Sequence, residues 1–339
     1  MVSINGLNSC FPQNKVSQIE IAEFGKSIFT KFGKDFDRMH QVYENSGVKH
    51  RFIVNELGWY AKEHSWMERN ILFKKNAKEL LINCIQKTLQ NTKKTANEIG
   101  GIVVVNTTGI STPTLDVDLI NEFNFKNDIK RLPIFGYGCA GGVLGLARGV
   151  EIHNKIKKPV LVCNVELCSL TFRPQIFSKS NIISTALFGD GASSYILDNS
   201  GICKVLNSFE YLWNGTTHFM GWKIEDDGLA VVFDKIIPEF ISNNLPGVLS
   251  KYMSIPKSGY ILHAGGMKII QSYEKILKNH DSIKFSKEIL ANYGNVSSVS
   301  VVLVLKKIIE DKIKGNFCML ALGPGFTVAM SELRIEDHD

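Results

Sequence analysis

The chain has 339 residues, of which 44% are hydrophobic and 21% are charged. This composition excludes an intrinsically disordered chain and allows one large core or two fused ones. Lys and Arg number 39 against 33 Asp and Glu, a net charge of +6. An excess this mild and dispersed suits an anionic small-molecule substrate and does not favour nucleic acid, whose partners carry a concentrated basic stripe.

The cysteines and the first residues indicate the compartment. Seven cysteines, an odd number, occur without any CxxC spacing, so neither a disulfide framework nor a zinc cluster is predicted. The first residues lack the basic and apolar regions of a secretory signal. The longest apolar run, 299–305, is too short to cross a bilayer. We therefore expect a cytoplasmic protein with reduced thiols, without membrane insertion and without a metal.

Residues 1–199 predict alternating helices and strands. Apolar residues recur at helical i, i+4 spacing in some segments, whereas others are short β-branched runs typical of buried strands. Helices are expected at 79–90 and 139–156, and strands at 101–105, 132–135, 160–165 and 192–197.

Residues 200–339 predict a similar order of elements. Strands are expected at 204–213, 229–234 and 259–262, a helix at 236–252, and a hairpin at 318–322 and 327–333. The segment 299–313 is ambiguous, because its valines favour a strand whereas its length and the preceding serines favour a buried helix. The two halves show no sequence repeat, so the shared order is weak support for duplication.

Cys139 is the first candidate for a chemical role. It follows a predicted strand, begins a predicted helix and has glycines close on both sides, which leave its sulfur reachable. A helix N-terminus favours the thiolate and lowers the pKa of a thiol. A nucleophilic cysteine needs this setting, although a buried structural cysteine is the more frequent role for a residue of this type.

His263 and Asn295 are the candidates for its partners. His263 ends the apolar strand 259–262 and precedes two glycines, and catalytic groups often stand at strand ends of α/β sheets. The other seven histidines lie in polar or charged stretches, which predicts solvated side chains. Asn295 lies between Gly294 and a helix start, where a plain N-cap is the alternative role. A satisfied core histidine is likewise the alternative for His263.

These three segments, taken in order, resemble a known family. GCAGG at 138–142, HAGG at 263–266 and GNVSS at 294–298 are similar to motifs of the type III polyketide synthases, the chalcone-synthase-like ketosynthases. Further similar segments are TFR at 171–173, LFGDGA at 187–192 and GPGFT at 323–327, so the resemblance spans nearly the whole chain. It implies an α/β thiolase-like fold of two similar mixed-sheet halves, 1–199 and 200–339, in α-β-α-β-α layers.

The resemblance also implies a mechanism. Cys139 would be the acylated nucleophile, paired with His263 as an imidazolium. Malonyl-CoA would lose carbon dioxide, and His263 and Asn295 would donate hydrogen bonds to the thioester enolate. The carbanion would attack the acyl group on Cys139, and repeated cycles with ring closure would release a pyrone or a resorcinol. The substrates are CoA thioesters, and no cofactor or metal is implied.

Family positions that line the substrate cavity fall on several residues here. Phe188 matches the aromatic at the junction of CoA tunnel and cavity, and the second such aromatic falls at Val231, which predicts a more open gate. Core packing is the alternative role for Phe188. The remaining positions that match cavity-lining or loop residues are Cys168, Thr171, Thr112, Gly323, Pro324 and Gly325. Room at Val231 and Ala321 suggests a long fatty starter.

Arg38, in the segment FDRM at 36–39, matches an arginine that meets CoA phosphates in relatives, and a solvated surface arginine is the alternative. The family is expected to be homodimeric. The nearest rival function is a single condensation by a 3-oxoacyl-carrier-protein synthase III, which uses the same Cys, His and Asn. A thioesterase with a Cys-His-Asn site is the rival from another class, and a non-catalytic binding role is a third possibility.

Overall fold

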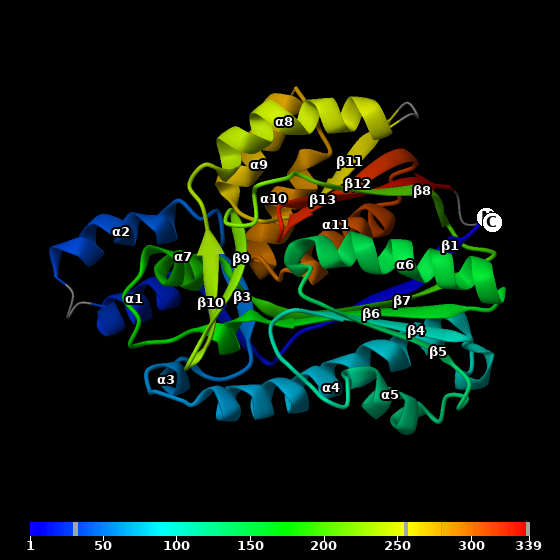
Figure 1. Ribbon diagram of the computed structural model, residues 1–339, viewed down its shortest axis with the longest axis horizontal. Coiled ribbons are helices and arrows are strands. Elements are labelled where there is room, and N and C mark those ends of the chain that lie inside the picture. Colours follow the sequence, from blue (N-terminus) through cyan, green and yellow to red (C-terminus); the bar gives the residue numbers. More distant parts are fainter. Residues whose placement is uncertain (30–32, 254–256, 279, 337–339) are drawn as a thin grey trace.

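Two mixed β-sheets carry the fold, and helices cover and separate them in five layers, α-β-α-β-α (Figure 1). The computed structural model describes residues 1–29, 33–253, 257–278 and 280–336. The layered thiolase-like arrangement predicted from the family resemblance is therefore confirmed.

The N-terminal sheet has five strands in the order β5-β4-β6-β7-β1. Its central strands run parallel, β4 with β5 and β6, whereas β7 pairs antiparallel with both β6 and β1. Both faces are covered, so β6 reads VLVCNVEL with every residue buried. The strands are β1 (Ser3–Cys10), β4 (Gly101–Asn106), β5 (Lys130–Phe135), β6 (Val160–Leu167) and β7 (Asp190–Asp198).

The C-terminal sheet has four strands in the order β11-β12-β13-β8. Here β11 runs parallel to β12, and the pairs β12–β13 and β13–β8 are antiparallel. A short contact, Ser3–Ile4 of β1 against 203–204 of β8, joins the two sheets into one hydrogen-bonded series. The strands are β8 (Cys203–Leu212), β11 (Gly259–Leu262), β12 (Gly315–Gly323) and β13 (Thr327–Ile335).

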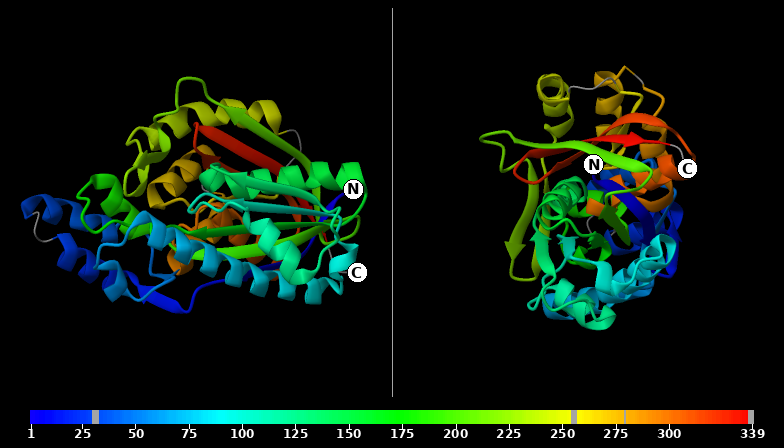
Figure 2. Two further views of the ribbon diagram at one scale, coloured as in Figure 1. Left: turned by 60° about the horizontal axis from the view of Figure 1, so that its bottom comes forward. Right: turned by 90° about the vertical axis from the view of Figure 1, so that its right-hand side faces the viewer.

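Two helices fill the middle layer between the sheets, α6 (Gly141–Ile156) and α11 (Ser298–Glu310), and the end-on view in Figure 2 shows α6 there. They approach so closely that a Cβ on Gly142 would lie 2.2 Å from the backbone oxygen of Ser298. The ambiguous segment 299–313 is thus a helix, because burial on all sides accepts its valines. Tertiary packing overrides the β-propensity of that segment.

The outer layers are helical as well. α4 (Trp66–Thr92) and α5 (Leu115–Phe123) cover the N-terminal sheet, and α4 begins with a capping box of Ser65 and Glu68. The opposite outer layer consists of α8 (Ile237–Tyr252) and α9 (Met267–Ile276), and α10 (Ile283–Tyr293) packs against α9, β11 and the middle helix α11. None of the helices in the described ranges is long and apolar enough to cross a membrane.

Smaller elements flank the ends of the layers, where α1 and α2 project furthest (Figure 2). Their arrangement matters because several of them enclose the cavity described below. They are β2 (Asn14–Ser17), α1 (Gln18–Phe29), α2 (Lys34–Glu44), β3 (His50–Ile53), α3 (Leu57–Tyr60), α7 (Lys179–Leu187), β9 (Met220–Glu225) and β10 (Gly228–Phe233).

Every strand and helix predicted from periodicity is present. Most bounds differ by a few residues, but the helix expected at 79–90 is only the second half of α4, which already begins at Trp66. One side-chain prediction was wrong. His153, expected to be solvated, is buried, and its ring nitrogens bond the Lys158 carbonyl and the Asn199 side chain. The division of the chain at residues 199 and 200 stays a prediction.

Candidate active site

Three chain segments converge where the two middle helices begin. Cys139 lies in the 3-10 turn Gly138–Ala140 that leads from β5 into α6. His263 directly follows β11, and its backbone N–H still bonds the Leu320 carbonyl of β12 at 2.9 Å. Asn295 precedes α11. Helix starts and strand ends therefore present all three side chains at one place in the molecule.

The carboxamide of Asn295 is held in one orientation. Its Oδ1 accepts from the Ser297 backbone N–H at 2.8 Å, and its Nδ2 donates to the Gly265 carbonyl at 3.1 Å. The same Oδ1 lies 4.0 Å from the Cys139 Sγ, which is directed at it. Because Nδ2 carries two hydrogens, one N–H remains for a ligand after the bond to Gly265.

His263 is buried, yet among the described residues neither of its ring nitrogens has a hydrogen-bond partner. Gly265 borders it, since a Cβ on residue 265 would lie 3.2 Å from Nε2. Gly265 thus touches both the imidazole and the Asn295 amide, and its missing side chain keeps the space beside them open. A buried polar atom without a hydrogen-bond partner destabilises the folded state, so these nitrogens are suited to bind a polar ligand.

The charge state of the site differs from the expectation at the sequence level. Burial raises the pKa of the Cys139 thiol to about 12, and the nearby Glu166 carboxylate acts in the same direction. Burial also lowers the pKa of His263 to about 3. The loss of water around both groups outweighs the helix N-terminus. Burial therefore favours a neutral thiol and a neutral imidazole over the thiolate and imidazolium expected from the sequence.

Glu166, at the end of β6, is a buried carboxyl group behind the thiol. It accepts hydrogen bonds from the backbone N–H groups of Thr107 and Thr108, from the Thr108 hydroxyl and, across the two halves, from the Ser298 hydroxyl at 2.7 Å. Burial nevertheless raises its pKa to about 7. A carboxyl group with this pKa can hold or release a proton near neutral pH.

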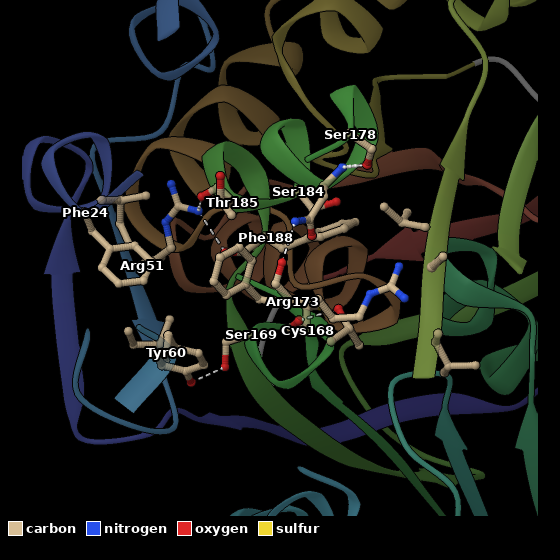
Figure 3. A pocket seen from close by; sticks show the side chains of 18 of the residues that line it. Phe24, Arg51, Tyr60, Cys168, Ser169, Arg173, Ser178, Ser184, Thr185 and Phe188 are labelled. Atoms are coloured by element: carbon tan, nitrogen blue, oxygen red, sulfur yellow. Dashed lines mark hydrogen bonds between the residues drawn. The ribbon is translucent and has the colours of Figure 1, made fainter. Parts of the chain in front are cut away.

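A cavity with an empty volume of about 690 Å³ opens beside this site (Figure 3). Four of the predicted substrate-binding residues line it, namely Cys168, Thr171, Phe188 and Val231. Its wall combines apolar side chains with hydroxyl, amide and guanidinium groups. The other lining residues are Ile21, Phe24, Arg51, Ile53, Leu57, Tyr60, Ser169, Phe172, Arg173, Ser178, Asn181, Ser184, Thr185, Trp222, Leu229 and Ala230.

Phe188 separates this cavity from the three convergent residues. It lines the cavity, and its backbone forms a parallel β-bridge with Asn295. Its ring packs on that of Phe233, with 5.9 Å between ring centroids. Phe233 lies two residues after Val231 on β10 and so faces the same side of the strand. Phe233, which the sequence analysis did not nominate, is therefore an aromatic neighbour of Phe188 on the strand that carries Val231, and the wider gate expected at Val231 stays a prediction.

Arg51 of β3 fixes the chain that carries Phe188. Its buried guanidinium donates to the carbonyls of Thr185, Ala186 and Phe188 at 2.7–2.9 Å. These carbonyls lie at the end of α7, where backbone oxygens lack helical partners. The arginine thus closes the helix end and holds the aromatic gate in register with Asn295.

Several nominated residues do not line the cavity. Thr112 is exposed in the loop after β4, and Ala321 is fully buried within β12. Gly323 and Pro324 pack against the turn that carries Cys139 instead, and Gly325 lies beside Leu212 and Thr327. A Cβ on Gly138, which has φ +49°, would lie 2.9 Å from the Pro324 ring, and one on Gly323 would lie 2.5 Å from the Tyr137 carbonyl. This loop supports the turn that carries the thiol.

Arg38 lies on α2, and its side chain falls outside the described part of the chain. Within the described residues, no group of three or more His, Cys, Asp or Glu side chains could hold a metal ion.

Sequence reasoning missed Glu166, Arg51 and Phe233. A signal for Glu166 was present in the sequence, because it is the one charged residue in the strand 160–167, all of whose residues are buried. Arg51 and Phe233 gave none, since their roles depend on contacts with α7 and Phe188 from distant parts of the chain.

Comparisons with known proteins agree with this geometry. Residues 5–200 match the N-terminal domain of chalcone and stilbene synthases, and residues 205–334 match the C-terminal domain. A putative chalcone synthase of Bacillus subtilis is 31% identical over 96% of this chain and 97% of its own length. A 1,3,6,8-tetrahydroxynaphthalene synthase of Streptomyces peucetius is 28% identical over 98% of this chain and 93% of its own length.

Among solved structures, the 1,3,6,8-tetrahydroxynaphthalene synthase of Streptomyces coelicolor superposes with a TM-score of 0.92 at 24% identity, and covers 99% of this chain and 100% of that one. The chain belongs to the chalcone and stilbene synthase family, the type III polyketide synthases. It is accordingly a condensing enzyme of the acyltransferase class, a family that works on CoA thioesters.

Proposed function

We propose that this enzyme condenses malonyl-CoA units onto an acyl starter carried by Cys139 and releases a cyclised pyrone or resorcinol. The observation that supports the proposal is the buried His263, whose ring nitrogens have no partner in the described part of the chain, beside the oriented Asn295 amide and the Cys139 thiol. No cofactor or metal enters any step.

Acylation starts from the neutral pair. As the Cys139 sulfur attacks the carbonyl carbon of the acyl-CoA, His263 accepts the thiol proton, so that a free thiolate never has to persist in the buried site. The carbon–sulfur bond to CoA then breaks, and the imidazolium gives its proton to the departing CoA thiolate. The raised pKa of the thiol and the lowered pKa of the imidazole both support this order.

Decarboxylation uses the same imidazole as a donor. The carbon–carbon bond to the malonyl carboxylate breaks, carbon dioxide leaves, and negative charge develops on the thioester oxygen. The neutral His263 N–H and the second N–H of Asn295 would donate to this oxygen. Donors fixed in a water-poor site before the charge appears stabilise it most effectively, and each is worth about 3 kcal/mol.

Carbon–carbon bond formation follows. The enolate carbon attacks the acyl carbonyl on Cys139, and the carbon–sulfur bond to the enzyme breaks, which extends the chain by one malonyl-derived unit. The departing sulfur takes a proton from His263, and the imidazole recovers a proton from water. The lengthening acyl group would occupy the cavity beyond Phe188, whose wall includes Ile21, Phe24, Leu57 and Phe172. This apolar side supports an aliphatic starter, with a long fatty chain as the proposal to test.

The remaining parts of the proposal concern partners. Arg38 would meet the CoA phosphates. A homodimer is supported by exposed apolar side chains. Phe135 ends the edge strand β5, and Tyr137 follows it just before Cys139. Leu212, at the end of β8 and beside Gly325, is exposed as well. Thr112 lies in a loop that would reach the partner subunit. Seven free thiols fit the reducing cytoplasm.

The test is reconstitution with purified components. The enzyme, malonyl-CoA and a series of acyl-CoA starters of increasing chain length are incubated without any carrier protein, and products are identified by mass spectrometry. We expect pyrones or resorcinols, formed fastest with one range of chain lengths. Strict dependence on a carrier protein would instead establish a single-step ketosynthase, and rapid thioester hydrolysis without carbon dioxide release would establish a thioesterase.

A further inference from the structure

Two cysteines meet on the far side of the N-terminal sheet from the middle helices. Cys10 ends β1, and Cys84 lies on α4, which packs on that strand (Figure 1). The Cys84 Sγ lies 3.6 Å from the Ala192 carbonyl of β7, and the two thiols are close enough for each to shift the pKa of the other. Cys10 pairs with the same Ala192 in the sheet. Both sulfurs therefore converge on one point between strand and helix.

The helix can come this close because of Gly6. A Cβ at that position would lie 3.0 Å from the Thr88 carbonyl oxygen and 2.5 Å from a methyl group of Thr92. Because residue 6 has no side chain, α4 lies directly on β1, and Cys84, one helical turn before Thr88, reaches Cys10.

A lysine completes the cluster. The Lys87 Nζ lies 3.6 Å from the Cys10 Sγ, and Lys87 itself is exposed to solvent. A cation at this distance stabilises a thiolate. The pKa of Cys10 is lowered to about 6, first by the hydrogen bond from Cys84 and then by Lys87, against the opposing effect of burial.

We propose that Cys10 and Cys84 form a peroxide-reactive dithiol, in which Cys10 is the reacting sulfur and Cys84 resolves the product into an internal disulfide. This site is separate from the condensation chemistry and uses neither Cys139 nor His263. Its ligand class is a small hydroperoxide that can reach a sulfur with only 7% of its residue surface exposed.

The reaction balances in two steps. The Cys10 thiolate attacks one oxygen of hydrogen peroxide, the oxygen–oxygen bond breaks, and hydroxide leaves and becomes water, so that sulfur is oxidised to sulfenic acid and peroxide is reduced. The Cys84 thiol then loses its proton and attacks the Cys10 sulfur, the sulfur–oxygen bond breaks, and a second water leaves. The sum is two thiols and one peroxide to one disulfide and two waters.

The other cysteines lack this combination. Four of the remaining five expose 3% or less of their surface. Cys139 is slightly more exposed than Cys10, at 9% against 7%, but its neighbours are the Asn295 and Ser297 side chains and the Glu166 carboxyl group, none of them a cation. We therefore expect peroxide to consume Cys10 first.

The experiment treats the purified full-length enzyme with hydrogen peroxide, then alkylates all remaining thiols in denaturant and digests with trypsin. The expected product is a disulfide between the peptides 1–15 and 79–87, found in material that migrates as a single chain on a non-reducing gel. Alkylation of Cys10 and Cys84 should be lost together. Unchanged alkylation of both, or a disulfide that joins Cys84 to Cys163, would overturn the proposal.

Three variants assign the roles. Cys84→Ser should leave a sulfenic acid on Cys10 that dimedone captures. Lys87→Met should slow the loss of Cys10 by about threefold or more. Lys75→Met, which removes an exposed lysine elsewhere on α4, should leave the rate unchanged. Equal rates in both lysine variants, or capture of the sulfenic acid on Cys139 before Cys10, would refute the proposed chemistry.

Discussion

The two halves of the molecule share one plan but contribute different groups to the site. The strand order β5-β4-β6-β7-β1 of the first half corresponds to β11-β12-β13-β8 of the second, with the same parallel and antiparallel directions and without an equivalent of β5 in the described residues. In each half the helix of the middle layer is followed along the chain by an inner strand of the sheet, α6 by β6 and α11 by β12. One plan therefore places two helix starts, α6 and α11, face to face.

The difference between these helix starts sets the chemistry. The first half offers a sulfur just before α6, followed by glycines that let the helices touch. The second half offers an amide just before α11 and an imidazole after β11. This arrangement suggests a division of work in which the first half carries the acyl group and the second half generates the carbanion.

The largest expected effect separates these two tasks. Cys139→Ala should abolish condensation, with product formation reduced by about 10⁴-fold or more, because it removes the sulfur proposed to carry the starter. Decarboxylation of malonyl-CoA should persist, since His263 and Asn295 remain. Product is measured by mass spectrometry and decarboxylation by the release of labelled carbon dioxide. If condensation continues, Cys139 is not the acyl carrier.

The next effect tests the second half. Asn295→Ala removes one donor to the enolate oxygen and should slow decarboxylation by about 10²–10³-fold. Acylation of Cys139, followed by mass spectrometry of the intact protein, should persist in this variant. Asn244→Ala on α8 is the matched control and should leave both steps intact, because within the described residues its side chain donates to the Phe240 carbonyl of its own helix. Equal losses of both steps in Asn295→Ala would mean that Asn295 shapes the whole site.

The sequence predicted the elements and the three convergent residues better than it predicted their environment. Buried strands such as 160–167 are visible in the sequence, because burial on both faces demands an unbroken apolar run. The charge state of Cys139 could not be predicted from the sequence. A helix start is a local feature that the sequence shows, whereas the burial that raises the pKa of the thiol comes from all the surrounding layers. Phe233 escaped notice for the same reason, because only the folded hairpin brings it to Phe188.

The contact between the two middle helices gives a test of stability. Gly142→Ala would place a methyl carbon 2.2 Å from the Ser298 backbone oxygen, which cannot rotate away. We expect a loss of about 4 kcal/mol in the free energy of unfolding, above the usual cost of overpacking. Gly247→Ala in α8 is the control, since its Cβ meets nothing within 4 Å and alanine there should stabilise by about 0.5–1 kcal/mol. Urea unfolding measures the free energy of unfolding of both variants. Similar values for Gly142→Ala and Gly247→Ala would show that α6 and α11 can move apart without loss of stability.

The smallest expected effect is a pH dependence across the same interface. The Glu166 pKa rises from 4.5 to about 7 through burial, so between these pH values the folded protein keeps a proton that the unfolded chain has lost. Stability from this group is therefore complete below about pH 4.5 and declines as the pH rises through 7, by about 2–3 kcal/mol. Glu166→Gln removes this titration, while the Ser298 hydroxyl can still pair with an amide. Urea unfolding from pH 5 to 8 should show the variant gaining on the wild type as the pH rises, whatever constant offset the altered hydrogen bonds impose. Parallel profiles would mean that Glu166 is already charged at pH 5, and that its hydrogen bonds from Thr107, Thr108 and Ser298 outweigh its burial.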